Sequence, residues 1–527
     1  MTRTSADVLI VGSGMNSLVA AALLALKGRS VHVLEREAVL GGCIRTEQLT
    51  VPGFLHDTMS MAHPAFVAGP AFALLGSALQ DAGLRYCSNG SPTGVLMSDG
   101  RSLVLNTSRE ANIAKFDRLC PGDGQAHADA MAQVEANAEL VFGLLGNPVW
   151  SRSLAKVLAK YVWKRGVRDT AAYLGGATLS CRNWLETSIG SEPLQALLAP
   201  WTLHNGLGPD SPLSALMTQV IILALESVGM PIPEGGNART VDAFVKVISE
   251  AGGVFETGAD VEKVLVSKGR AYGVRLVGGR EIRADHVICN VTPTQLYGRL
   301  LDAQHIPPEI LKQAETYRYG KGNMQIHLAL SEPPKWADPE LNDVCYLHLT
   351  DGVAAVSRAV NQAERGLLPE SPTICVSQPC SVDPSRAPAG QSVLWIQLPE
   401  CPRVIQGDAA GEIPVPGNGA WTAEVREAYA DRVIECISRH VPNLKASILG
   451  RKVVSPADLA ALNINLVGGD PYGGACDLDQ YMLWRPLKGT RNHETPVRNL
   501  WHIGASTHPG PGLGGVSGML IAQKLGA

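Results

Sequence analysis

Several features that this 527-residue sequence lacks exclude whole classes of protein. The formal net charge is −4, so there is no basic field of the kind that favours a nucleic-acid partner. The 11 cysteines are scattered singly, with no CxxC pair and no dense framework, which indicates reduced thiols rather than a disulfide scaffold. No apolar run reaches the roughly 20 residues of a bilayer-spanning helix, and we expect no signal peptide. The expected location is therefore cytoplasmic.

The composition that is present describes a folded protein with a large interior. Hydrophobic residues make up 45% of the chain and charged residues 18%. At a typical domain size of roughly 150 residues, the length predicts about two to four structural units. We expect two domains, interleaved along the chain.

The N-terminus carries a strand, a glycine turn, a helix and a second strand. Residues 7–11 are aliphatic and predict a buried parallel strand, followed by the turn Gly12-Ser13-Gly14. Residues 18–27 predict a helix and residues 30–34 a second strand. Its last residue is followed by Glu35, where a carboxylate can accept a hydrogen bond from a ribose hydroxyl. Such a βαβ unit places a pyrophosphate on the helix N-terminus and predicts dinucleotide binding, with Ser17 in place of a third glycine.

Two further glycine-rich segments complete the pattern. Gly41-Gly42 follows the second strand and leads through Cys43 to Arg45 and Thr46. Near the C-terminus, a predicted strand ends at Gly504, and a Gly/Pro loop leads to a helix that begins near Gly514. Between them, residues 254–290 read as short strands separated by glycine turns.

Together these segments resemble the FAD-dependent family that contains phytoene desaturases, monoamine oxidases and related oxidoreductases. The closing segment, residues 504–518, is the most specific match. The resemblance implies an α/β fold with a Rossmann-type, glutathione-reductase-like FAD-binding domain that is discontinuous, together with an α+β substrate domain. The third residue of the Gly41-Gly42 element is usually Arg in that family and is Cys43 here; Arg45 is the basic residue nearby. No metal site is predicted.

The resemblance also implies which residues hold FAD. The backbone of Val261 is expected at the adenine, and the closing loop at the flavin ring. The expected cofactor-binding residues are Gly12, Ser13, Gly14, Asn16, Ser17, Glu35, Arg36, Gly41, Gly42, Arg45, Thr46, Val261, Gly504, Ala505, Gly514, Gly515 and Val516. The FAD-binding domain is expected in residues 1–61, 231–300 and 481–527. The substrate domain takes residues 62–230 and 301–480.

The substrate side offers fewer signals, because a flavin carries the redox chemistry itself. Glycines flank Tyr472 in residues 463–480, a segment that resembles one beside the flavin in the desaturase branch. Asp470, Tyr472, Gln480 and Arg485 are candidates for substrate or flavin contacts, against ordinary loop hydrogen bonding. Asp57, whose family equivalent lies on the flavin face, is a candidate base whose pKa burial would raise. His204 is a second candidate, and a structural role is the alternative for both.

Residues 150–168 form a basic segment with tryptophans at its surface positions. Such a helix can lie on an anionic membrane and admit lipophilic substrate, although a solvated helix packed on the core gives the same pattern.

These observations predict an FAD-dependent dehydrogenase or desaturase that moves hydride from a hydrophobic substrate carbon to flavin N5, with oxygen or a quinone as electron acceptor. No second strand–glycine–helix unit indicates a nicotinamide domain. The alternatives are an amine oxidase, for which Trp484 and Trp501 are the only loose candidates for an aromatic pair, a redox-neutral isomerase, and a non-redox binding protein of the same fold.

Overall fold

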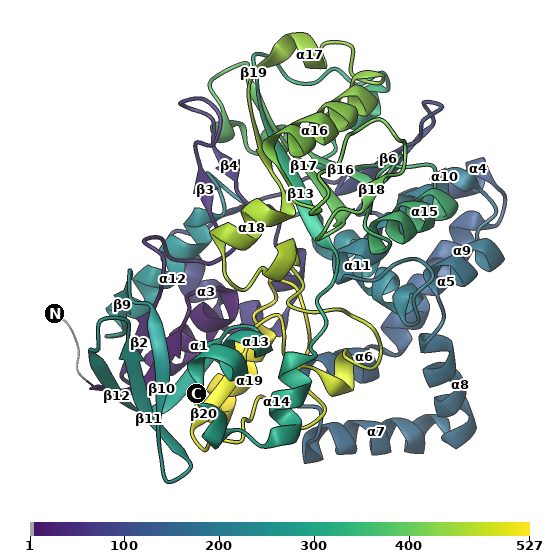
Figure 1. Ribbon diagram of the computed structural model, residues 1–527. Helices are drawn as coiled ribbons and strands as arrows, with labels where there is room; N and C mark the ends of the chain where they lie inside the picture. The colour runs from purple at the N-terminus through teal and green to yellow at the C-terminus, as the bar shows by residue number, and fades with distance from the viewer. Residues whose placement is uncertain (1–4) are drawn as a thin grey trace.

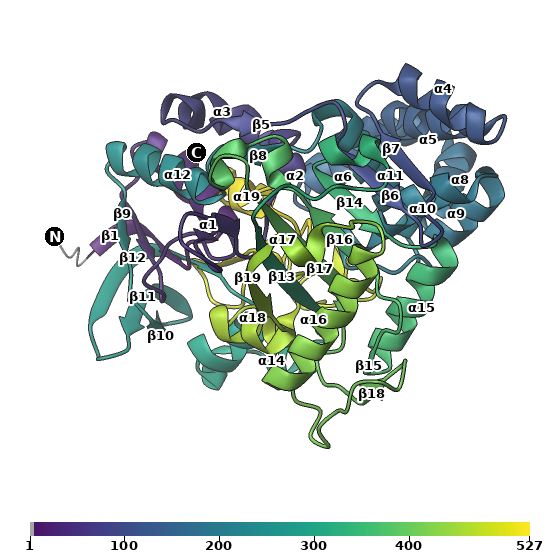
Figure 2. The same ribbon diagram turned by 90° about the horizontal axis from the view of Figure 1, so that it is seen from above.

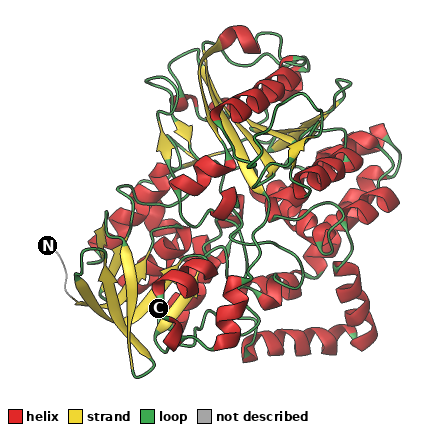
Figure 3. Ribbon diagram, in the orientation of Figure 1, coloured by secondary structure: helices red, strands yellow, loops and turns green. Residues whose placement is uncertain are grey.

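The computed structural model describes residues 5–527, which form two large sheets with helices around them (Figures 1 and 3). One seven-stranded sheet lies at the lower left of Figure 1 and includes the first and the last strand of the described chain, β1 and β20. The other seven-stranded sheet lies above it. The α/β fold that the sequence predicts is confirmed.

The first sheet is assembled from three distant parts of the chain. Its strands β20, β12, β1, β2 and β9 run parallel in that order, and the antiparallel hairpin β10–β11 continues from β12. The strands are β1 Ser5–Val11, β2 Val31–Leu34, β9 Val254–Glu256, β10 Val261–Ser267, β11 Arg270–Leu276, β12 Glu281–Asn290 and β20 Leu500–Ile503.

The strands of this sheet are apolar on both faces, so both faces are covered by other elements. In β1, Val8 and Ile10 pack under the helices, whereas Leu9 and Val11 face the hairpin side. The helices on the first face are α1 Met15–Leu26, α3 Pro70–Asp81, α12 Ala238–Glu250 and α19 Val516–Lys524. The other face is covered by the hairpin and by η2 Leu296–Leu300 and α14 Pro308–Glu315.

The second sheet has the strand order β19-β13-β17-β16-β14-β6-β7. Helix α16, Ala423–Ser438, packs on one face, and helices that include α9–α11 pack on the other (Figure 2). The strands are β6 Thr93–Leu96, β7 Ser102–Leu105, β13 Gly322–Leu330, β14 Tyr346–Leu349, β16 Ile374–Ser377, β17 Ser392–Cys401 and β19 Ile448–Val454.

The remaining elements are helices and short strand pairs. The helices are α2 Pro64–Val67, α4 Arg109–Leu119, α5 Asp123–Ala136, α6 Ala138–Gly146, α7 Arg152–Arg165, α8 Val167–Ala177, α9 Cys181–Ser188, α10 Glu192–Leu198, η1 Ala199–Asn205, α11 Ser214–Val228, α13 Pro293–Gln295, η3 Ala303–His305, η4 Pro339–Asp343, α15 Val353–Glu364, η5 Pro379–Ser381, η6 Pro384–Arg386, α17 Leu444–Ser447, α18 Pro456–Leu462, η7 Val467–Gly469 and η8 Met482–Trp484. The strand pairs are β3 Thr46–Glu47 with β4 His56–Asp57, β5 Tyr86–Cys87 with β8 Ile232–Pro233, and β15 Leu367–Leu368 with β18 Gly407–Asp408.

The sequence pattern misplaces one helix boundary. The predicted basic helix over residues 150–168 is broken at Gly166, whose φ of +83° ends α7 and turns the chain into α8. Among the described residues, no helix is both long and apolar enough to cross a bilayer.

Candidate functional site

The opening glycine turn lies between β1 and α1. Gly12 has a φ of +88°, which a residue with a side chain rarely adopts, and it lets the chain reverse directly into the helix. The Glu35 carboxylate lies against this turn: it accepts hydrogen bonds from the Ser13 amide at 3.0 Å and the Ser13 hydroxyl at 2.6 Å. The predicted ribose carboxylate is therefore placed beside the helix N-terminus.

The second glycine pair crosses the opening turn. The Gly41 amide donates to the Ser13 hydroxyl at 2.9 Å, and a Cβ on Gly42 would lie 3.3 Å from the Gly14 Cα. The two backbones are thus close enough that any side chain between them would be crowded. The two glycine motifs, which are separate in the sequence, are therefore in direct contact in the fold.

The closing loop meets the same turn from the other end of the chain. The Gly504 amide donates to the Ser517 hydroxyl at 3.0 Å, and the Gly518 amide to the Asn16 side chain at 3.3 Å. A Cβ on Gly504 would overlap Asn290 Oδ1. Asn290, at the end of β12, donates in turn to the Ser17 hydroxyl at 3.0 Å. Segments that lie about 500 residues apart in the sequence therefore form one cradle.

The other predicted cofactor residues lie around this cradle, and each has its own hydrogen-bond or ion-pair partner or a place at a helix end. The Ala259 amide donates to the Glu35 backbone carbonyl at 2.8 Å, two residues before Val261 at the start of β10. Thr46 donates to Asp57 at 2.7 Å, and Arg36 forms a half-buried ion pair with Glu37. Gly514 and Gly515 precede Val516, the first residue of α19, and Ala505 accepts a hydrogen bond from a buried arginine.

That arginine is Arg485, which holds the Tyr472 segment against the closing loop. Its Nε donates to the Ala505 carbonyl at 2.9 Å, and another of its nitrogens donates to the Tyr472 carbonyl. Asp470 accepts from three backbone amides, those of Gly320, Tyr472 and Gly474, at 2.7 to 2.9 Å. Burial raises the pKa of Asp470, and these amides oppose the rise. Both charged side chains are committed to backbone groups.

Tyr472 lies in an apolar cluster between this segment and the start of α11. Its hydroxyl donates to the Leu203 carbonyl in η1, and burial raises the pKa of Tyr472 well above its ordinary value. Gln480 pairs with the backbone of Arg318 in both directions, at 3.1 and 2.7 Å. The buried members of the cluster are Leu207, Leu213, Met217, Tyr472, Cys476 and Tyr481.

Asp57 is bound on both oxygens. One oxygen accepts from Thr46 at 2.7 Å and from the Asn237 amide at 2.8 Å, and the other from Arg386 at 2.7 Å. Burial raises the pKa of the Asp57 carboxyl, whereas the Arg386 guanidinium lowers it. Arg386 is fully buried and also pairs with Asp383 at 2.6 Å. This buried ion-pair network favours the structural role for Asp57 over that of a base.

His204, the other candidate base, is not brought to Asp57. It lies at the end of η1, where its Nε2 is 3.0 Å from His348 Nε2 on β14. Burial lowers the pKa of His204 to about 4. The ring is therefore neutral near pH 7 and can supply a lone pair or one N–H.

Comparison with known proteins decides the family. The model of the family described as flavin containing amine oxidoreductase matches residues 18–428. The chain belongs to the flavin-containing amine oxidoreductase family.

Relatives extend over almost the whole chain. Pyridine nucleotide-disulfide oxidoreductase domain-containing protein 2 of Rattus norvegicus is 27% identical, over 98% of this chain and 92% of the relative. The zeta-carotene-forming phytoene desaturase of Myxococcus xanthus is also 27% identical, over 98% and 93% of the two chains. The resemblance that the motifs carry is thereby confirmed.

Solved structures share the fold at low identity. An oxidoreductase from Methanosarcina mazei has a TM-score of 0.61 at 18% identity, over 98% of this chain and 99% of the other. Cyclohexylamine oxidase from Brevibacterium oxydans has a TM-score of 0.56 at 15% identity, over 99% and 100% of the two chains. This member of the flavin-containing amine oxidoreductase family is an FAD-dependent oxidoreductase, as the sequence predicts.

The residues present fit FAD. Gly12 and Gly42 leave backbone without side chains at the N-terminus of α1, which suits a pyrophosphate. Arg45 Nε is buried without a hydrogen-bond partner among the described residues, so a polar donor remains available beside the cradle. The Gly518 amide in the first turn of α19 donates to Asn16 in the first turn of α1, so the two helix N-termini, which carry the positive ends of the helix dipoles, lie close together.

Two residues of the site carry no sequence motif. Asn290 joins β12 to both glycine loops, and its only signal is its place at the end of a predicted strand. Arg386 lies 329 residues from Asp57, in a segment where no motif marks it. Neither contact can be read from local spacing, because Asn290 reaches the loops only through the pairing of β12 with β1 and β20, and Arg386 reaches Asp57 only through the tertiary packing of η6.

Proposed function

We propose that this family member is a dehydrogenase that forms a C=C bond in a hydrophobic substrate. A hydride leaves one substrate carbon, a proton passes from the neighbouring carbon to solvent, and the two electrons pass on to oxygen or a quinone. Bound FAD supplies the hydride acceptor at N5. The chain's own contribution is to hold the substrate carbon in place and to exclude water.

The apolar cluster around Tyr472 carries this proposal. It joins the start of α11 to the glycine segment that Arg485 ties to the closing loop. The polar side chains of that segment are already bound: Asp470 by backbone amides and Arg485 by carbonyls. The rest of the cluster is hydrocarbon, sulfur and two tyrosine rings, which suits an uncharged lipophilic substrate.

The role of each cofactor residue follows from its place. Gly12, Gly14 and Asn16 would take the pyrophosphate at the N-terminus of α1, and Glu35 a ribose hydroxyl. Val261 would contact adenine, and residues 504–516 the flavin ring. In this proposal, residues 1–61, 231–300 and 481–527 form the FAD-binding domain, and residues 62–230 and 301–480 the substrate domain.

Amine oxidation is the second candidate, since solved structures with this fold include cyclohexylamine oxidase. An amine oxidase of this family would be expected to place two aromatic rings together near the closing segment. Trp484 packs instead on Trp150, with ring centroids 5.8 Å apart, and Trp501 packs on His286. The two tryptophans thus have separate neighbours, which favours desaturation.

A stopped-flow test separates the two candidates. Under anaerobic conditions, the flavin absorbance near 450 nm should bleach with polyene hydrocarbons and stay unchanged with primary amines. Met217→Gln places an amide in the apolar cluster and should slow the bleaching at least tenfold, whereas Leu449→Gln, at an exposed position on β19, serves as the matched control. Bleaching by amines alone would reverse the assignment.

We also propose that α7 and α8 place the protein on an anionic membrane. These helices lie at the lower right edge of Figure 1, away from both sheets. Trp163 is 86% exposed and Val167 73% exposed, close to Lys156, Arg165 and Arg168. A tryptophan at the interface with lysine and arginine around it suits acidic lipid headgroups, and a lipophilic substrate would reach the protein through that surface.

A further inference from the structure

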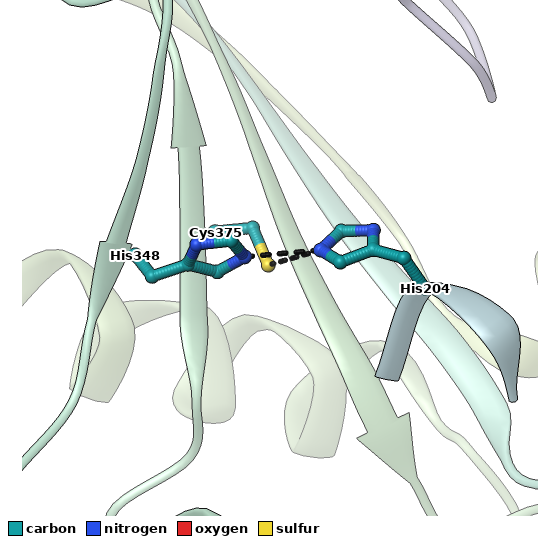
Figure 4. A group of neighbouring side chains, drawn as sticks. All are labelled: His204, His348 and Cys375. Atoms are coloured by element: carbon teal, nitrogen blue, oxygen red, sulfur yellow. Dashed lines mark hydrogen bonds between the residues drawn. The ribbon is translucent and has the colours of Figure 1, made fainter. Parts of the chain in front are cut away.

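Two histidines and a cysteine from three distant segments meet on one face of the second sheet. His204 ends η1, His348 lies on β14 and Cys375 on β16, and Figure 4 shows the three side chains pointing toward one another. The two imidazole Nε2 atoms are 3.0 Å apart, and Cys375 Sγ is 4.0 Å from His204 Nε2. All three candidate ligand atoms lie within 4.8 Å of one another.

The fold fixes this arrangement through strand register. His348 and Cys375 are direct partners in the antiparallel pair β14–β16, so their side chains leave the sheet on the same face. Both are fully buried. η1 packs over that face and supplies His204 from above, where its ring also lies 4.7 Å from the Trp201 ring. The cluster is therefore held by three elements rather than by flexible side chains.

We propose that His204, His348 and Cys375 bind one zinc ion. Two imidazole nitrogens and a sulfur are a ligand set that zinc prefers, and tetrahedral zinc places such atoms about 3.4 to 3.6 Å apart. The present separations need adjustments of a few tenths of an ångström to about one ångström to reach that geometry. Three protein ligands leave the fourth position to water or another small ligand.

Protons balance in this binding step. Zinc takes Cys375 as the thiolate, so the thiol proton passes to solvent. In the tautomer in which His348 donates its Nε2–H to His204, that proton moves to His348 Nδ1 on binding, which frees both Nε2 lone pairs for the metal. His348 Nδ1 is buried and has no partner among the described residues, so its protonation displaces no existing hydrogen bond.

Zinc at this position would tie η1 to the second sheet. Leu203, the neighbour of His204, accepts the hydrogen bond from Tyr472, so the ion would act one residue from the Tyr472 contact. The rings of Trp201 and Tyr346 lie against both histidines and shield the cluster from solvent. The inference does not depend on which substrate the protein oxidises.

Zinc content measured on the intact flavoprotein tests the proposal. Untagged holoprotein is incubated with Zn²⁺, passed through a desalting column with a weak chelator, and analysed by mass spectrometry for metal and by zinc K-edge absorption. About one zinc per chain with nitrogen and sulfur neighbours is expected. Zinc should also raise the midpoint of thermal unfolding, because it binds the folded state.

Variants locate the ion. Cys375→Ser and His204→Gln should each lower the zinc content at least tenfold, while Cys401→Ser, a buried cysteine on β17 of the same sheet, should keep it. If Cys375→Ser does not fold, as its flavin absorbance would report, the half-buried His204→Gln decides. The proposal is overturned if wild-type protein retains no zinc, or if both ligand variants retain as much as Cys401→Ser.

Discussion

At Gly504 the closing loop has no room for a side chain. Its φ is +111°, and an added Cβ would overlap the side-chain oxygen of Asn290. Gly512, in the same loop, has a similar φ of +115° but open space around it. Gly504→Ala should therefore displace the loop from the α1 turn, whereas Gly512→Ala adds only the strain of positive φ.

We expect Gly504→Ala to lose most of its bound flavin, with at least a tenfold higher Kd for FAD, and Gly512→Ala to lose little. The ratio of absorbance at 450 and 280 nm after gel filtration, followed by FAD titration, measures both. Equal retention by the two variants would mean that the closing loop does not hold the cofactor.

Arg386 is a second residue whose replacement has a defined cost. Its guanidinium lies between two buried carboxylates, Asp57 at 2.7 Å and Asp383 at 2.6 Å. Arg386→Met leaves both without a counter-ion and should destabilise the protein by about 3–5 kcal/mol. Arg318→Met, which removes an exposed pair with Asp479, should cost about 0–1 kcal/mol.

Thermal and urea unfolding of the two variants side by side measures this difference. A second measurement separates stability from catalysis. If Asp57 acts as a base, Asp57→Asn should abolish turnover with flavin still bound; a purely structural Asp57 predicts that turnover follows flavin content and the folded fraction.

Among the elements, α7 presents the clearest surface for a test. Its buried residues Leu154 and Tyr161 face the protein, while Trp163 points outward at 86% exposure. Trp163→Ser should lower binding to vesicles of acidic phospholipid severalfold, since an interfacial tryptophan is removed. Leu449→Ser, on exposed β19, is the control, and sedimentation with acidic and with zwitterionic vesicles is the measurement. Binding that is equal for both lipids, or unchanged in Trp163→Ser, would contradict the membrane surface.

The sequence predicts those helices and strands whose formation depends on local residues alone. The predicted strand at residues 7–11 lies within β1, and the helix that follows it is α1, because an aliphatic run and a glycine turn are local signals. The helices around α7 are harder to delimit. Gly166 ends α7, although the basic pattern continues on both sides of it. A glycine within a helical pattern does not by itself predict that the helix ends there.

For the protein as a whole, the sequence predicts the part that carries glycine motifs. The cradle of Gly12, Gly42 and Gly504 follows from motifs and a family resemblance. The seven strands of the second sheet carry no motif, and β14 pairs with β6 from some 250 residues earlier. The cluster of His204, His348 and Cys375 exists only through that sheet. The sequence predicts His204 as a candidate base, whereas His348 and Cys375 are brought together only by the pairing of β14 with β16.

The buried histidines make the stability of the whole molecule depend on pH. Burial lowers the pKa of each of five histidines outside the proposed zinc site to about 3 or 4, from an ordinary value of 6.5. These are His56, His63, His493, His502 and His508. In the unfolded chain they take up protons near pH 6.5, so below that pH the unfolded state binds more protons than the folded state.

Their contribution to stability is therefore complete above about pH 6.5 and is lost as the pH falls toward 4, by up to about 1.4 kcal/mol per pH unit for each histidine. The midpoint of thermal unfolding, followed by tryptophan fluorescence with excess FAD present, should be clearly lower at pH 5.0 than at pH 7.5. His502→Gln keeps a donor for the Val291 carbonyl, which His502 Nε2 now contacts at 2.7 Å, and removes one titrating group. Its midpoint should fall less over the same interval, and a wild-type midpoint that does not change between the two pH values would show that these rings accept protons without unfolding.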